Sequence, residues 1–187
     1  MGREANGTLQ IQLIGNTLNT INGIDGDPKA TWGEALDAIK LLTGVEDGQI
    51  NRVIYKKEIA LSSGGVLTLD VFDFAGFDCG GGDGQDQLGQ PMAVDEMVLI
   101  FVKLKAGSAG QLRVGAEGSG AAWNTPWGCD DAYTPLRATS TLPGFFILFV
   151  PSSTGLEVTD VTNHLLKFEA VGGACTFDLL LCGRDNP

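Results

Sequence analysis

The chain has little of the chemistry that enzymes and metal proteins commonly use. It contains one histidine, and its four cysteines form no CxxC pair and no metal-ligand spacing. A three-histidine zinc site is therefore excluded. A Ser–His or Cys–His hydrolase would depend on His164 alone, and the sequence has no G-x-S-x-G elbow. We expect His164 to be a structural or surface residue, and we expect no cofactor and no enzymatic activity.

Basic residues and long apolar runs are also scarce. The chain has 12 Lys and Arg against 23 Asp and Glu, which gives a formal net charge of -11. Such a negative surface repels nucleic-acid phosphates and anionic membranes, so we expect neither as a partner. The longest apolar runs, near Val98–Val102 and Phe145–Val150, have the length of strands rather than of membrane-spanning helices.

The start of the chain and the cysteines point to a cytosolic site of synthesis. The first residues, MGREANGTLQ, lack the apolar core of a signal peptide. Reduced thiols are then the expected state. Cys175 and Cys182 fall in one expected strand at an odd offset, which places them on opposite faces and prevents a direct bridge between them.

The chain is instead rich in glycine and in short apolar segments. Its 27 glycines exceed average usage and suit many tight turns. From position 51 onward, apolar segments of strand length alternate with Gly, Pro, Ser and Asn turns, which favours a β-sandwich, jelly roll or barrel. The expected strands are Arg52–Leu61, Val66–Phe72, Met97–Lys105, Leu112–Gly115, Phe145–Val150, Leu156–Val161, Leu165–Val171 and Thr176–Cys182.

Two of these segments differ in their pattern. Met97–Leu104 (MVLIFVKL) is nearly continuously apolar, so we expect a central strand that is covered on both faces. His164–Val171 alternates: Leu166, Phe168 and Ala170 are expected in the core, with the charged residues between them facing solvent.

The first 50 residues have a separate organisation. Thr8–Ile14 alternates, with Leu9, Ile11 and Leu13 on one face, and predicts a half-buried strand. A polar stretch, Gly15–Lys29, predicts a loop. We therefore divide the chain into an N-terminal arm over residues 1–50 and a β-sandwich over residues 51–187.

A short helix is predicted within the arm, over Trp32–Thr43. Thr31 and Glu34 fit a capping box, and Gly44 is a suitable stop. Apolar residues recur at helical spacing, at Trp32, Ala35, Leu36, Ile39 and Leu42. A lone amphipathic helix must dock on its own domain or on a neighbouring subunit.

Two long segments interrupt the strands, and each has alternatives. Gly81–Leu88 matches one calcium-binding β-roll unit, with Asp83 and Asp86 as weak candidate ligands. A single unit cannot complete a site, so a flexible acidic loop is favoured. Gly115–Thr141 holds Trp123 and Trp127, which could stack on a sugar, anchor the loop or contact a subunit; we favour the last two.

Short phrases in the sequence, read in order, resemble one group of proteins. They are TWGEALDAIKLLTG, Gly48 with Asn51 and Val53, Leu69–Val71, Val102–Ala106, Leu112–Ala116, PGFFILFVP, Leu156–Thr159 and Phe177–Gly183. The order resembles small structural proteins of tailed bacteriophages and prophages, including capsid decoration (cement) proteins with a jelly-roll-like domain. The resemblance spans roughly Trp32–Arg184, and the insertion at Phe77–Asp95 departs from it.

The resemblance implies a non-enzymatic virion protein, made in the bacterial cytoplasm, that binds the outer capsid surface and stabilises the shell. It implies the major capsid protein as partner, and self-association as a homotrimer, with a dimer as the alternative. The interface residues that we expect are Leu9, Ile11, Leu13, Trp32, Leu36, Ile39, Trp123 and Trp127.

Two other hypotheses stay open. The first is a lectin-like carbohydrate-binding module, or a β-module of a fibre or tail, that uses the tryptophan loop. The second is a hydrolase with paired carboxylates among Asp70, Asp73, Asp130 and Asp131, although nothing near these acids predicts a raised pKa.

Overall fold

The fold was obtained as a computed structural model. The structure describes residues 7–9, 15–17, 30–32, 39–43, 45–47, 49–85, 91–150, 152 and 154–185. Within these ranges all regular elements are strands, so the prediction of a mainly β protein is confirmed.

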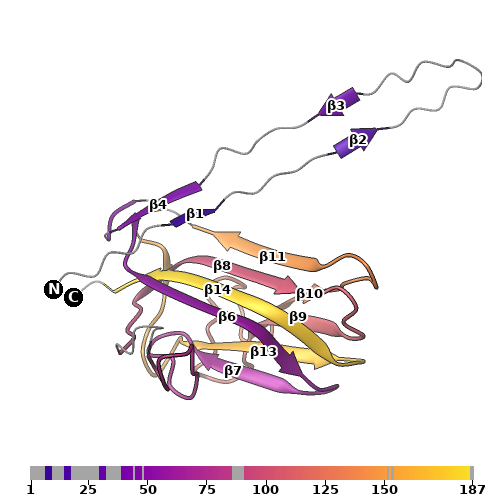
Figure 1. The fold of residues 1–187 in the computed structure, drawn as a ribbon. Coiled ribbons are helices and arrows are strands. Elements are labelled where there is room, and N and C mark those ends of the chain that lie inside the picture. The colour runs from indigo at the N-terminus through magenta and orange to yellow at the C-terminus, as the bar shows by residue number, and fades with distance from the viewer. Residues whose placement is uncertain are drawn as a thin grey trace, which may run out of the picture.

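Two antiparallel sheets face each other to form the body of the molecule (Figure 1). The first sheet has the order β11 (Gly144–Phe149), β8 (Glu96–Leu104), β14 (Cys175–Arg184) and β6 (Arg52–Leu61), and β12 (Leu156–Glu157) also pairs with β8. The second sheet has the order β10 (Tyr133–Leu136), β9 (Gln111–Ala116), β13 (Leu165–Val171) and β7 (Val66–Asp70).

The core lies between the sheets, and strand alternation builds it. On β13, Leu166, Phe168 and Ala170 are fully buried while Lys167 and Glu169 are partly exposed, as the alternating pattern predicted. Phe168 stacks on a phenylalanine of β14, Phe177, with ring centroids 5.1 Å apart. Facing side chains from the two sheets therefore interdigitate in one apolar layer.

All eight predicted strands of the body are present, although the predicted strand Leu156–Val161 is reduced to Leu156–Glu157. β6 and β13 have the predicted bounds, and the other predicted strands differ at their ends. β10 was missed, because it falls in the long segment expected to be a loop. It is the edge strand of its sheet, and Pro135 interrupts its pattern, which sheets tolerate at an edge.

β8 occupies the central position expected from its continuous apolar run. It lies between β11 and β14, and its residues from Met97 to Ile100 are all buried. The two cysteines of β14 lie on opposite faces, as expected. Cys175 belongs to the core between the sheets, whereas Cys182 packs with Leu99 on the other face.

The N-terminal strands pair among themselves. β1 (Gly7–Leu9) is antiparallel to β4 (Ile39–Thr43), and β2 (Gly15–Thr17) is antiparallel to β3 (Ala30–Trp32). β4 is also parallel to β5 (Gln49–Ile50), which leads directly into β6. In Figure 1, β2 and β3 lie away from the two sheets of the body.

The helix predicted over Trp32–Thr43 is wrong where the structure describes that range. Trp32 ends β3, Ile39–Thr43 forms β4, and residues 33–38 lie outside the described residues. Ile39 and Leu41 also fit a two-residue period, and their strand pairs with β1 at Leu9 and Gly7. A short apolar segment fits both periods, and pairing with a partner strand decides between them.

Candidate functional site

The first sheet of the body has a second apolar surface on the side away from the core. Alternate residues of a strand point to opposite faces, and the strand register groups the outward residues into rows. We call this surface the outer face. One row is Phe149, Leu99, Cys182 and Val53, and the next is Ile147, Phe101, Leu180 and Tyr55.

Several side chains of the outer face remain open to solvent. Phe145 is 54% exposed, Tyr55 42% and Ile147 38%. Phe101 lies beside Phe145, with ring centroids 6.0 Å apart. Single exposed apolar residues are ordinary, but a continuous apolar patch of a sheet commonly marks an interaction surface.

The first row of the outer face is covered by the chain itself. Ile50 of β5 is 1% exposed and packs against Val98, Leu99 and Cys182. Burial there raises the pKa of the Cys182 thiol to about 12. The N-terminal segment thus covers one end of the outer face, while Ile147 in the second row stays partly exposed.

Charged residues border the other end of the outer face. Lys105 Nζ lies 3.0 Å from Asp178 Oδ2, and the amide of Glu58 donates a hydrogen bond of 3.0 Å to Asp178 Oδ1. Burial alone raises the pKa of Asp178, but that hydrogen bond and the nearby ammonium group outweigh burial, so the pKa is lowered. Lys57 adds a further charge and lies over the ring of Tyr55, 5.5 Å from its centroid.

A buried arginine fastens the base of the N-terminal arm to the body. Arg184 is 0% exposed. It donates hydrogen bonds to the carbonyl oxygens of Val45 and Glu46, at 3.1 and 3.2 Å, and to that of Ser152. Its Nε lies 3.3 Å from Glu96 Oε2. Sequence reasoning missed this residue, because a single arginine at the end of an apolar strand does not indicate which backbone carbonyl groups will lie around its side chain.

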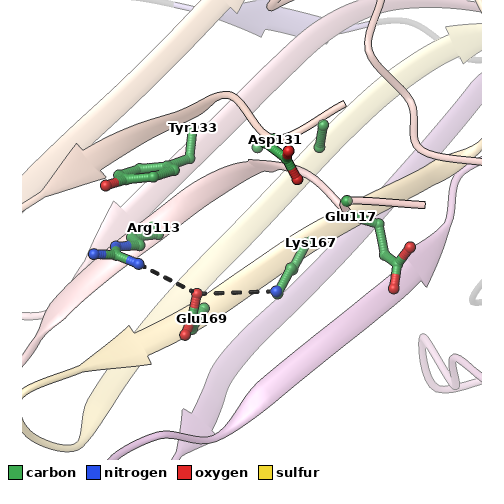
Figure 2. A pocket seen from close by; sticks show the side chains of 9 residues that line it. Arg113, Glu117, Asp131, Tyr133, Lys167 and Glu169 are labelled. Carbon is green, nitrogen blue, oxygen red and sulfur yellow. Dashed lines mark ion pairs between the residues drawn. The ribbon is translucent and has the colours of Figure 1, made fainter. Parts of the chain in front are cut away.

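The second sheet carries a charged hollow of about 160 Å³ (Figure 2). The guanidinium of Arg113 lies over the ring of Tyr133, 4.4 Å from its centroid. Arg113 and Lys167 both approach Glu169, at 3.7 and 4.0 Å. Ligand pockets usually exceed roughly 300 Å³, so this hollow is small for an organic ligand. Two of its cations, Arg113 and Lys167, already form ion pairs with Glu169.

His164 pairs with an acid in the second sheet. Its Nε2 lies 3.6 Å from Asp70 Oδ2. Its Nδ1 is buried without a hydrogen-bond partner. Burial is the main cause of a raised pKa at Asp70, and the hydrogen bonds from Phe72 and Asp73 oppose it. The expectation of no raised pKa near the paired acids is therefore wrong for Asp70.

Of the two loop tryptophans, Trp123 is fully buried and Trp127 is partly buried against the core. Trp123 is 0% exposed, and its Nε1 donates a hydrogen bond of 2.8 Å to Glu157 O. Trp127 packs edge-on against it and stacks on Phe146, at centroid distances of 6.3 and 6.2 Å. Trp123 therefore acts as a loop anchor and cannot stack on a sugar.

One of the two weak calcium candidates, Asp83, lies within the described residues. Asp83 Oδ1 accepts a hydrogen bond of 2.5 Å from the amide of Gly76, which stabilises its own loop. Asp86 lies outside the described residues. In the described ranges, no group of three or more His, Cys, Asp or Glu is placed to hold a metal ion.

The predicted interface residues of the arm are only partly described. Leu9 lies in β1 directly opposite Ile39 in β4, and Trp32 ends β3. Ile11, Leu13 and Leu36 lie outside the described residues. Across the ranges described above, no helix is long and apolar enough to cross a membrane.

No protein-family model matches the chain, and no curated protein matches it. The residues that sequence reasoning missed are those of the outer face, chiefly Tyr55, Phe145 and Ile147. The signal that could have found them is the continuous apolar run of β8, because a strand covered on both faces needs an apolar surface on each side.

Proposed function

We propose that the body of this protein is a jelly roll. Its strands, in chain order, are β6, β7, β8, β9, β10, β11, β13 and β14. One sheet combines the first, eighth, third and sixth of these, and the other combines the second, seventh, fourth and fifth. Two sheets of interleaved strands from two Greek keys define the jelly roll, which recurs in viral capsid and lectin domains.

We further propose that the protein is a non-enzymatic virion component that binds the outer surface of a capsid shell and stabilises it. The observation that carries this proposal is the outer face: an apolar surface on a sheet whose other side already fills the core. The jelly-roll order adds support by analogy of fold alone. The resemblance of the sequence to capsid decoration proteins points the same way.

In this proposal, the free energy of binding between the protein and the capsid shell stabilises the shell. Burying an apolar side chain fully contributes roughly 1.5–3 kcal/mol. Phe145, Ile147 and Tyr55 are about half exposed, so each contributes on the order of 1 kcal/mol when a partner covers it. A ligand that binds only the assembled shell stabilises it by mass action. The net charge of -11 suits the exterior, away from packaged nucleic acid.

The proposed partners are the major capsid protein and further copies of this chain. A homotrimer is the preferred assembly, and a dimer is the alternative. Most closed assemblies of identical chains are symmetric, so each copy would present the same surface to the shell.

Co-sedimentation with capsid shells tests the function. The shells are assembled from a purified major capsid protein, the proposed partner, and their melting is followed with and without this protein. We expect binding and a higher shell melting temperature. Ile147→Lys should weaken both effects, whereas Val161→Lys, at an exposed position in a loop, should leave them unchanged. A protein that does not bind shells refutes the proposed function.

A further inference from the structure

We propose that two copies of this protein pair along β11, edge to edge, so that their first sheets join into one continuous antiparallel sheet. The inference specifies the self-association within the proposed function and rests on it in that respect. It uses the backbone along the margin of the sheet, whereas the proposed shell contact uses the outer face. Antiparallel pairing of two identical strands has two-fold symmetry, so it favours the dimer over the homotrimer.

β11 is an edge strand of the first sheet (Figure 1), and no strand among the described residues pairs with its far side. The amide of Val150 donates a hydrogen bond of 2.8 Å to Val98 O, in the register that β11 keeps with β8. Backbone groups of successive residues alternate between the two sides of a strand. The N–H and C=O groups of Phe145, Ile147 and Phe149 therefore point to the free edge.

The free edge of β11 lacks the features that commonly keep two sheets from joining. Charged side chains, proline and bulges on an edge strand discourage pairing with another chain. β11, with the sequence GFFILF, has none of them. The other edge strands each have one: β6 carries Lys56 and Lys57 and a shift of register, β10 contains Pro135, and β7 ends at Asp70. β11 is therefore the edge that is open to a partner strand.

A second copy of β11 fits this edge. Antiparallel pairing centred on Ile147 places that residue opposite its own copy. On the outer face, Phe145 then lies opposite Phe149, and on the core side Phe146 lies opposite Leu148. The residues whose backbone groups point outward face one another, as an antiparallel ladder requires. Every opposed pair is apolar, so no like charges meet across the junction.

Side chains along this edge stay open to solvent on both sides of the sheet. Leu142, just before β11, is 64% exposed, and Phe145 is 54% exposed. Phe146 and Leu148 pack against the core but remain partly exposed. A second β11 would cover the margin of the core on one side and Phe145 on the other.

Edge pairing leaves the outer face free for the proposed shell contact. The two outer faces become neighbours in one sheet, so a dimer presents two linked binding surfaces to the shell. Linked surfaces bind with higher avidity than either surface alone when both can engage. The pairing also uses the β11 edge of both copies, so assembly along this edge stops at two chains.

Cross-linking of the full-length chain tests the pairing. All variants carry Cys129→Ser, because Cys129 is the exposed cysteine of the four. One variant adds Ile147→Cys. The matched control adds Tyr55→Cys, which lies in the same row of the outer face but at the opposite edge of the sheet. With a short bismaleimide, we expect the first variant to form a covalent dimer and the control to stay monomeric. A control that cross-links as readily overturns the inference.

Mass measurement of two variants at position 147 separates edge pairing from stacking of outer faces. Ile147→Pro removes an N–H that points to the free edge and spares the ladder with β8. Each dimer loses two hydrogen bonds, each worth roughly tenfold, so its dissociation constant should rise about a hundredfold. Ile147→Ala keeps the N–H and should raise the constant by less than about tenfold. If Ile147→Pro does not fold, as judged by its melting, the cross-linking comparison decides.

The remaining outcomes each decide for or against the pairing. A wild-type chain that is monomeric, or a homotrimer, overturns the inference. Equal weakening by Ile147→Ala and Ile147→Pro also overturns it, because the contact would then depend on side chains of the outer face. Shell binding is measured separately. A monomer that binds shells disproves this inference and leaves the proposed function standing, whereas an edge-paired dimer that ignores shells does the reverse.

Discussion

Replacing Arg184 with methionine should strongly destabilise the protein. The side chain is fully buried and holds three backbone carbonyl groups as well as Glu96. Methionine fills a similar volume but leaves the Glu96 carboxylate without its cation. Removing one partner of a buried ion pair costs about 3–5 kcal/mol, and we expect a loss of unfolding free energy in this range.

Equilibrium unfolding in urea at neutral pH measures this loss. With a slope of roughly 2 kcal/mol per molar urea, the midpoint should fall by about 2 M. Arg137→Met is the matched control: Arg137 is exposed, so its replacement should change the unfolding free energy by no more than about 0.5 kcal/mol. Adding Glu96→Gln to the Arg184 variant should recover part of the loss, because a neutral amide is less costly to bury than an unpaired charge.

The result that would refute the reasoning is an Arg184→Met protein within about 1 kcal/mol of the wild type. Equal losses for the two arginine variants would also refute it. Proteolysis adds a local test, because the segment at 45–47 should become cleavable when its carbonyl groups lose the guanidinium.

Three further predictions concern single positions in the body. In the folded protein, iodoacetamide should modify Cys129 and spare Cys182, whose burial raises its pKa to about 12; equal labelling before unfolding, read by mass spectrometry, would contradict this. Gly110→Ala should cost about 1–3 kcal/mol, because a Cβ there would lie 2.2 Å from a backbone oxygen, whereas Gly120→Ala should cost little since its surroundings are open. The folded protein lowers the pKa of Asp178 below its ordinary value of 3.8, so its contribution to stability is present above that pH and is lost as the pH falls through the folded value. The stability difference between wild type and Asp178→Asn, from urea titrations, should therefore shrink on acidification, and a difference that grows would contradict the sign.

The predictability of the fold differed between its parts for physical reasons. β13 was predictable because one of its faces is buried and the other is partly exposed to solvent, so apolar and charged residues alternate along its sequence. β10 was not, because an edge strand with Pro135 needs only its neighbour β9 to form. The predicted helix failed at Ile39–Thr43 because pairing with β1 is a long-range contact that local periodicity cannot register.

The candidate site was predictable only in outline. The arm was expected to contact a neighbour from the alternation at Leu9, and that expectation stays a prediction. The outer face depends on which strands lie side by side: Ile147, Phe101 and Leu180 belong to three strands that are distant in the sequence. Trp123 was ambiguous because a large aromatic residue in a Gly-rich loop suits an anchor as well as a contact.

The position of β14 determines when the proposed binding surface can exist during synthesis. β14 follows every other strand of the body in the sequence, yet it lies between β6 and β8 and supplies Leu180 and Cys182 to the outer face. Until the ribosome has released that segment, β6 and β8 have no common neighbour, and the arm lacks the guanidinium that fastens its base. A partly synthesised chain therefore cannot present the proposed binding surface before translation has passed Arg184.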